Sequence, residues 1–307
     1  TKERPVKIAP IEFPEPIYSV SIRPLTKTDV DKLGTVLPRI TEEDPTLQVR
    51  RDTDTSETIL SGMGDVHLEV VVDRMQRKFG VGVAAATPKV PYKETIAVPS
   101  KADYKHKKQT GGHGQYGHVC FELEPLPRGE GFQFAERVVG GAVPKNYIPA
   151  VEKGVQEGKL EGVLARYPVV DVRVTLYDGS SHPVDSSEIS FKIAASQALK
   201  KGLSQGQPVL LEPIMRLEVI VPEAFIGDII GDLNTKRAKV LGMTPEGGTQ
   251  IIEAQVPLAE ILRYAIDLRS ITQGRGTYKT EFSHYEEVPP HLADKIIAER
   301  AAEREKA

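Results

Sequence analysis

The chain has 307 residues, 39% of them hydrophobic and 27% charged, an ordinary composition for a globular protein with two or three cores. Its formal net charge of −3 excludes a protein that coats nucleic acid indiscriminately, although a local basic surface would be hidden in that total. The single cysteine, Cys120, excludes an internal disulfide framework and favours a reducing, cytoplasmic location. No apolar run approaches the roughly 20 residues that span a bilayer, so we expect no membrane partner.

Residues 13–88 alternate strands and helices in the order β-α-β-β-α-β. The strand "IYSVSIRP" precedes a helix that Thr26 and Asp29 are expected to start with a capping box. "TLQVRRD" and "ETILSG" are two further strands, and a second amphipathic helix ends at Gly80 before the strand "VGVAAA". This order predicts a ferredoxin-like domain, with two helices on one face of an antiparallel sheet. Residues 1–12 lack an initiator methionine and are expected to be a linker from a missing upstream domain.

Residues 89–211 are predicted to form a mixed α/β domain. Its strands include "HVCFELEPL" and "VVDVRVTLY", and helices are expected near residues 147–156 and 186–201. Asp185 and Glu188 would cap the second of these helices, and Gly202 would end it.

Residues 212–288 repeat the β-α-β-β-α-β order and predict a second ferredoxin-like domain. After the strand "IMRLEVIVP", Pro222 would open a helix, because the first helical turn tolerates proline. "KVLGM" and "TQIIEAQVP" are strands, one continuous helix would start at Pro257, and "TYKTEFSHY" is the last strand. Residues 289–307 predict a charged helix that packs on a neighbour through Leu292, Ile296 and Ile297. The expected fold class is therefore α+β and multidomain.

The stretch "TGGHGQYGH", residues 110–118, contains a G-x-G-x-x-G pattern at Gly112, Gly114 and Gly117. In a dinucleotide-binding or ATP-binding loop, the last glycine opens a helix whose N–H groups meet the phosphate. Here the residues that follow alternate as a strand, so a nucleotide-dependent enzyme using the Gly112 loop is disfavoured. A flexible turn without a role and a nucleic-acid contact remain as alternatives.

Basic residues before this turn support the nucleic-acid alternative. They concentrate positive charge where glycines let the backbone approach another surface: Lys101, Lys105, His106, Lys107 and Lys108. Gln115 could hydrogen-bond polar edges, and the Tyr116 ring could stack on a base. A second loop, residues 176–188, presents His182 beside Pro183 near the start of the predicted helix, where its ring could donate to phosphate or ribose oxygens.

Metal and catalytic sites find no support in the sequence. His106, His113, His118 and Cys120 match no standard zinc spacing. The helix start "GDVHLEVVVD" lacks the histidine pair of a zincin, and neither G-x-S-x-G nor a P-loop is present. We expect no catalytic residue, metal or cofactor in this chain.

Several motifs together closely resemble translation elongation factor G, from about Phe13 to Pro289. They are "SGMGDVHLEVVVDRMQRKF", "HKKQTGGHGQYGHV", "VVGGAVPKNYIPAVEKG", "PVVDVRVTLYDGSSHPVDSSE", "LLEPIMRLEV", "GDIIGDLNTKR" and "DLRSITQGRGTY". The resemblance covers that family's third to fifth domains, with the fourth an arm similar to ribosomal protein S5 domain 2. It implies that GTP and Mg²⁺ bind in a missing N-terminal half, so that the full-length protein would be a GTPase.

The resemblance implies a ribosome-binding half of a factor that drives translocation of tRNA and mRNA. The tip of the arm would enter the small-subunit decoding centre and hold the tRNA–mRNA duplex, and the fifth domain would face the large-subunit factor-binding centre. The third domain would relay the nucleotide state of the GTPase domain to the arm, and we expect a monomer.

The implied contact residues fall into three groups. The first group is the two tip loops. One loop comprises Gly111, Gly112, His113, Gly114, Gln115, Tyr116 and Gly117. The other comprises Ser180, Ser181, His182 and Asp185. Lys105, Lys107 and Lys108 would support them, and Asn234, Lys236, Arg237 and Arg275 would face large-subunit RNA. His182 matches the position that carries diphthamide in eukaryotic and archaeal relatives.

Three positions depart from the family's common bacterial form. His113 stands where Arg is usual, Ser181 where an aromatic residue is usual, and Pro183 where a polar or acidic residue is usual. Arg to His replaces a permanent charge by one that depends on pH. The alternative to a principal translocase is therefore a specialised paralogue acting in slow translocation, ribosome recycling or antibiotic protection.

Overall fold

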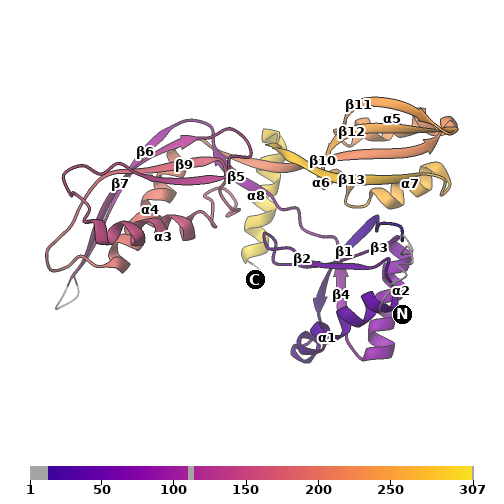
Figure 1. Ribbon diagram of the computed structural model, residues 1–307, viewed down its shortest axis with the longest axis horizontal. Helices are drawn as coiled ribbons and strands as arrows, with labels where there is room; N and C mark the ends of the chain where they lie inside the picture. Colours follow the sequence, from indigo (N-terminus) through magenta and orange to yellow (C-terminus); the bar gives the residue numbers. More distant parts are fainter. Residues whose placement is uncertain (1–12, 110–113, 306–307) are drawn as a thin grey trace, which may run out of the picture. The chain divides into compact units, whose positions relative to one another are not determined.

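The computed structural model describes residues 13–109 and 114–305, and Figure 1 labels its helices and strands. The chain divides into two compact units, Thr1–Val90 with Met215–Phe282, and Pro91–Ile214 with Ser283–Ala307. Among the described residues, the first unit holds two hydrophobic cores and the second unit holds one.

The first sheet has the strand order β2-β3-β1-β4 and antiparallel pairing throughout. Its elements are β1 (Tyr18–Pro24), α1 (Lys27–Glu43), β2 (Gln48–Arg51), β3 (Thr58–Gly62), α2 (Asp65–Phe79) and β4 (Val83–Ala86). The capping box of Thr26 and Asp29 is present, and Gly80 ends α2 in the left-handed region with φ of 62°. The first predicted ferredoxin-like domain is therefore confirmed.

A second sheet has the corresponding order β11-β12-β10-β13. Its elements are β10 (Pro208–Pro222), α5 (Ile226–Thr235), β11 (Lys239–Glu246), β12 (Thr249–Pro257), α6 (Leu258–Ile261), α7 (Tyr264–Thr272) and β13 (Thr277–Glu287). Leu217, Val219 and Val221 of β10 belong to the core between sheet and helices. The element order and strand order confirm the second ferredoxin-like domain.

Two helix boundaries in this domain were predicted wrongly. Pro222 is the last residue of β10, and a short 3-10 turn, Glu223–Phe225, precedes α5. The single helix expected from Pro257 is two helices, α6 and α7, separated where Arg263 adopts φ of −117°. The apolar stripe runs on across this break, so periodicity alone does not reveal it.

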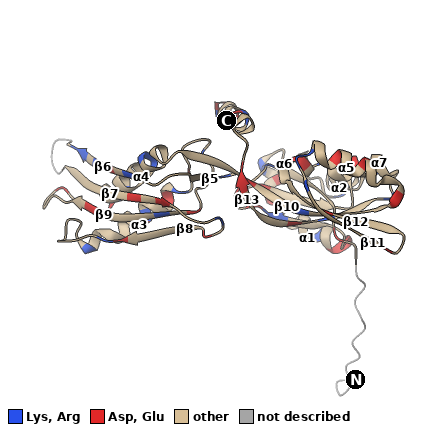
Figure 2. Ribbon diagram, turned by 90° about the horizontal axis from the view of Figure 1, so that it is seen from above, with Lys and Arg blue, Asp and Glu red and all other residues tan. Residues whose placement is uncertain are grey.

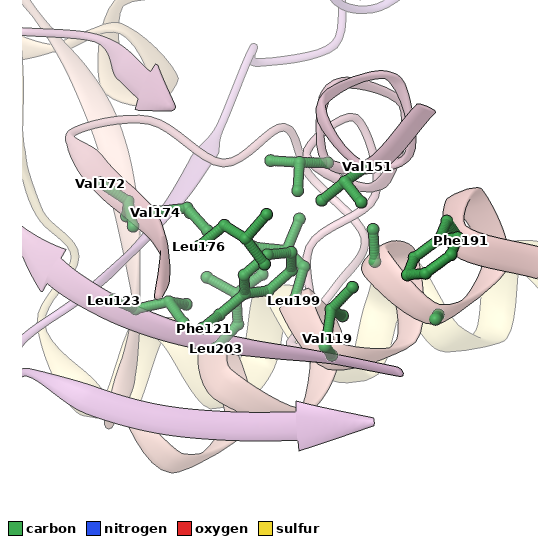
Figure 3. Packing of buried hydrophobic residues seen from close by; sticks show 14 of the residues in the cluster. Val119, Phe121, Leu123, Val151, Val172, Val174, Leu176, Phe191, Leu199 and Leu203 are labelled. Atoms are coloured by element: carbon green, nitrogen blue, oxygen red, sulfur yellow. The ribbon is translucent and has the colours of Figure 1, made fainter. Parts of the chain in front are cut away.

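The second unit contains the arm, a four-stranded sheet of order β6-β7-β9-β8. Its strands are β6 (Ser100–Lys108), β7 (Gln115–Pro125), β8 (Phe132–Glu136) and β9 (Val172–Ser180), and β5 (Lys93–Ile96) pairs with β10. Helices α3 (Ile148–Gly158) and α4 (Glu188–Gln205) pack on each other, and α4 also packs on β6 and β7. Figure 3 shows the core beneath them, where Phe121, Leu176 and Leu199 are fully buried.

The caps of α4 differ from those predicted. Ser187 rather than Asp185 is the N-cap, and its hydroxyl accepts the Ser190 N–H at 3.3 Å. At the other end the helix continues through Gly202 and ends at Gly206. Gly202 serves packing instead, because a Cβ there would lie 2.6 Å from Cδ1 of Leu123.

The C-terminal helix α8 (Pro290–Glu305) is present as predicted. Leu292, Ile296 and Ile297 are partly buried, and the Arg300 guanidinium lies 5.4 Å from the centre of the Tyr167 ring. Among the described helices, none is both long and apolar enough to cross a membrane.

The contact between α3 and α4 depends on Gly154, where a Cβ would overlap the carbonyl oxygen of Lys192. Gly154→Ala is expected to destabilise the arm by about 1–3 kcal/mol through overpacking. The control is Gly34→Ala in α1, where a Cβ meets nothing within 4 Å, and which should stabilise its helix by up to about 1 kcal/mol. Native-state hydrogen exchange of each helix measures both changes, and equal effects at the two positions would contradict the packing argument.

Candidate nucleic-acid interface

Strand pairing brings the two predicted tip loops to one end of the arm sheet. Lys108, the last residue of β6, pairs with Gln115, the first residue of β7, at that end. His118 of β7 pairs with Ser180 of β9, so the segment after β9 leaves from the same end. We call residues 105–109, 114–118 and 180–187 the tip.

Gly117 is a packing residue and opens no helix. It lies inside β7 and is buried, and a Cβ there would come within 2.8 Å of the Ser190 carbonyl carbon. The G-x-G-x-x-G pattern therefore ends in a strand that packs on the first turn of α4. The dinucleotide alternative lacks the helix N-terminus on which it depends.

Asp185 joins the two loops of the tip. Its carboxylate accepts the Gly114 N–H at 2.9 Å, and its carbonyl oxygen accepts the Tyr116 N–H at 2.8 Å. The next residue, Ser186, donates from its hydroxyl to the Tyr116 carbonyl oxygen at 3.1 Å. These three bonds fix the second loop against the start of β7.

A second set of bonds ties Ser180 to β7. The Ser180 hydroxyl lies 2.8 Å from the Tyr116 hydroxyl and 3.0 Å from Nδ1 of His118. Both Ser180 and Tyr116 are half-buried. The Tyr116 hydroxyl is therefore engaged within the protein.

His182 has a fixed orientation although its side chain is 49% exposed. Its Nδ1 accepts the N–H groups of Val184 at 3.3 Å and Asp185 at 3.2 Å, and its own N–H donates to the Ser186 hydroxyl at 2.8 Å. Because Nδ1 accepts these bonds, the neutral form of the ring carries its proton on Nε2. The 3.3 Å contact from Nδ1 to the Asp185 carboxylate is an ion pair only in the protonated ring. In the neutral form, Nε2–H is a donor that bonds no residue the structure describes.

Three lysines of the tip are available for a partner. Lys105, Lys107 and Lys108 are exposed, and none forms an ion pair with a residue that the structure describes. Figure 2 shows positive charge at the end of β6. Gln115 is also exposed, and its Oε1 lies 2.9 Å from Nε2 of His106. The tip thus combines free positive charge with oriented polar groups.

Four further residues were predicted to belong to the tip loops. Ser181 is exposed. Gly111, Gly112 and His113 lie outside the described residues, so their predicted contacts stay predictions.

The predicted large-subunit group divides into two kinds of residue. Asn234 and Arg275 are exposed, and the Arg275 guanidinium lies 4.6 Å from the centre of the Phe225 ring. By contrast, Lys236 lies 3.1 Å from Asp232 and 3.0 Å from Asp267, and Nε of Arg237 donates to Glu260 at 2.8 Å.

Lys236 is held as a charged group by these two carboxylates. Burial lowers its pKa, but the hydrogen bonds to Asp267 and Asp232 outweigh burial and raise the pKa above its usual value. Its side chain is only 14% exposed. Lys236 therefore has an internal role in joining α5 to α7.

The described part of the chain holds no cluster of metal ligands, and its cysteine is a weak nucleophile. No three His, Cys, Asp or Glu side chains gather there as metal ligands. Cys120 lies 3.7 Å from Nε2 of His118, but burial and the nearby carboxylates of Asp178 and Asp103 raise the pKa of its thiol. A thiol with a raised pKa is a poor nucleophile.

Comparison with known proteins gives three consecutive matches along the chain. Residues 13–87 match "Elongation Factor G, domain III", residues 88–207 match "Elongation factor G, domain IV", and residues 209–296 match "Elongation factor G C-terminus". The chain belongs to the elongation factor G family. It carries three domains of a translation factor and is thereby assigned to protein synthesis.

Two known proteins illustrate the extent of the similarity. An "Elongation factor G-like protein" of Thermotoga maritima is 52% identical over 303 residues, which are 98% of this chain and 44% of the relative. A crystal structure of a protein from Thermus thermophilus matches with a TM-score of 0.84 and 46% identity, over 95% of this chain and 44% of that one. The chain thus spans less than half the length of either protein.

Sequence reasoning missed the residues that hold the tip together. Ser186 and His118 were not predicted to have a role there, and Asp185 was predicted only as a helix cap and a contact. The partners of Asp185 and Ser186 lie about 70 positions away, at Gly114 and Tyr116, so no local spacing announces these bonds. Only the pairing of β7 with β9 brings them together.

Asp185→Ala is expected to free the second tip loop, because it removes the carboxylate that accepts the Gly114 N–H. A hydrogen bond to a charged group is worth about 1.5–3 kcal/mol, so exchange of the Gly114 amide should accelerate about tenfold or more. Amide hydrogen exchange measured by NMR tests this. Asp178→Ala is the control, since that exposed carboxylate accepts the neighbouring Gly179 N–H and no other N–H of the described residues. Equal acceleration in both variants would contradict the assigned role.

Lys236→Met is expected to act on stability, because it leaves Asp232 and Asp267 without their shared cation. The free energy of unfolding of this domain should fall by about 1–3 kcal/mol. Arg275→Ala, which removes an exposed cation–π contact and a long hydrogen bond of 3.5 Å to Gln273, should change it by less than about 1 kcal/mol. Denaturant unfolding of both variants distinguishes them, and an unaffected Lys236→Met protein would show that the ion pairs contribute little.

Proposed function

We propose that the chain is the ribosome-binding half of a translational GTPase that promotes GTP-dependent translocation of tRNA and mRNA. In this proposal the tip of the arm enters the small-subunit decoding centre and holds the tRNA–mRNA duplex. GTP and Mg²⁺ would be bound by a GTPase domain outside this chain, and the described residues would supply binding and orientation. The observation that carries the proposal is that the oriented ring of His182 and three exposed lysines, none paired with a residue that the structure describes, gather at one end of the arm sheet.

Each tip group suits RNA in a different way. Lys105, Lys107 and Lys108 can neutralise phosphates, which supplies affinity without sequence specificity. The Nε2–H of His182 and the amide of Gln115 can hydrogen-bond to ribose, phosphate or base-edge atoms. Because bonds to the backbone already fix the His182 ring, little side-chain entropy is lost when it binds.

The other domains receive supporting roles in the proposal. Asn234 and Arg275 are the predicted large-subunit residues that remain exposed for RNA near the factor-binding centre. The internal ion pairs of Lys236 and Arg237 would fix the α5 end beside them. The first ferredoxin-like domain would relay the nucleotide state to the arm.

Ser181 and Pro183 favour a second candidate within the same family, because both depart from its common bacterial form. This candidate is a specialised paralogue acting in ribosome recycling or protection. It would translocate weakly and would split post-termination ribosomes together with the recycling factor. A ribosome-splitting assay with the intact protein distinguishes the two candidates.

His182→Ala in the intact factor tests the proposed role of the tip. Loss of a hydrogen bond to a charged group should slow translocation on the order of tenfold, while ribosome-stimulated GTP hydrolysis stays near its usual rate. His291→Ala, an exposed histidine of α8, is the matched control. Slow hydrolysis with normal translocation per GTP would refute the assignment.

A further inference from the structure

A third loop leaves the arm sheet at the same end as the tip. Strand β8 runs parallel to β9, with Glu136 opposite Leu176, so residues 137–147 continue in the direction of the tip. This 137–147 loop packs against the tip's own supports. The Tyr147 hydroxyl donates to the Ser186 carbonyl oxygen at 3.2 Å, and a Cβ on Gly179 would lie 2.6 Å from a methyl group of Val143.

The 137–147 loop is anchored at both ends and at Val143, while the segment before Val143 projects into solvent. The Arg137 N–H donates to the Leu176 carbonyl oxygen at 2.8 Å, Val143 is buried, and the Tyr147 ring stacks on Phe191 with centres 4.8 Å apart. Between Arg137 and Val143, Val139 is 81% exposed, the highest value among the exposed large hydrophobic residues of the described chain. Gly140 and Gly141 follow with φ of 69° and 71°, and a Cβ on either would meet nothing within 4 Å. An apolar side chain is therefore displayed on a turn whose backbone is open to a partner.

The charge around this loop fits a polyanion. Residues 137–147 contain no acidic residue. Arg137 forms an ion pair with Glu122, with 3.0 Å between the guanidinium and the carboxylate. By contrast, Lys145 is exposed and forms no ion pair with any residue the structure describes. The tip adds three exposed lysines and the carboxylate of Asp185, which accepts the Gly114 N–H. Two exposed carboxylates, Glu136 and Glu188, border these segments, so the positive groups still outnumber the negative ones. This excess of positive charge occurs in a chain whose net charge is −3.

We propose that the 137–147 loop is a third RNA-contacting loop of the arm, flanking the His182 loop. Val139 packs against a ribose or base, the Gly140–Gly141 turn lets the RNA backbone approach closely, and Lys145 contacts a phosphate. This inference rests on the proposed function, since it takes ribosome-bound RNA as the partner of the arm. Its new content is that RNA contacts a segment outside the two predicted tip loops.

Binding of the chain to tRNA-loaded ribosomes across a salt series tests this loop. Each phosphate contact contributes about 0.7–0.9 to the slope of log affinity against log salt, so Lys145→Gln should lower the slope by about that amount. Lys200→Gln is the control at the other end of α4, where the lysine already pairs with Glu161 at 3.2 Å. Val139→Glu should weaken binding roughly tenfold by placing a carboxylate against phosphate. Leu160→Glu, at a residue 59% exposed, should not.

Lys107→Gln, measured alongside, separates failure of the inference from failure of the proposed function. If it lowers the slope and Lys145→Gln does not, the 137–147 loop makes no phosphate contact and the inference fails alone. If Val139→Glu weakens binding but Lys145→Gln leaves the salt slope unchanged, the loop contacts a protein instead of RNA, and the RNA proposal is overturned. If no variant changes the affinity or the salt slope, the proposed function is refuted, and so is the inference that rests on it.

Discussion

The pairing of β7 with β6 on one side and β9 on the other is the constraint on which the candidate interface depends. It places Gln115 opposite Lys108 and Ser180 opposite His118, so residues distant in sequence reach one end of the sheet. The bonds from Asp185 and Ser186 to Gly114 and Tyr116 then hold the second loop to the first. Orientation of His182 follows, because the same short segment supplies the N–H groups that its Nδ1 accepts.

Packing beneath the sheet brings the helices and strands of the arm together at positions where only glycine fits. Gly117 lets β7 approach the first turn of α4, Gly154 lets α3 approach α4, and Gly202 lets α4 approach Leu123. The glycines of the arm thus have two origins. Gly117 is required by close packing, whereas Gly140 and Gly141 are required by backbone conformation at a turn with free space around it.

The sequence allowed the two ferredoxin-like domains, the arm and the family to be predicted, because hydrophobic periodicity and local caps such as Thr26–Asp29 determine them. Prediction from the sequence was wrong where one local pattern is compatible with two structures. Asp185 looks like a helix cap until its partner Gly114 is known, and the stripe from Leu258 to Leu268 conceals a break at Arg263. Lys105, Lys107 and Lys108 are exposed, as their predicted role requires. For Lys236, the i,i+4 spacing could indicate the ion pair with Asp232, but the ion pair with Asp267 is a tertiary contact that no spacing encodes.

Chemical footprinting of ribosomal RNA with and without the purified chain, across a salt series, tests the central claim most directly. The claim is that this half binds ribosomal RNA through the tip of the arm and the exposed residues of the last domain. The account predicts protection at both the decoding centre and the factor-binding centre, weakening steeply as salt rises because phosphate contacts dominate affinity. Absence of protection at the decoding centre at low salt, with the fold intact, would contradict it.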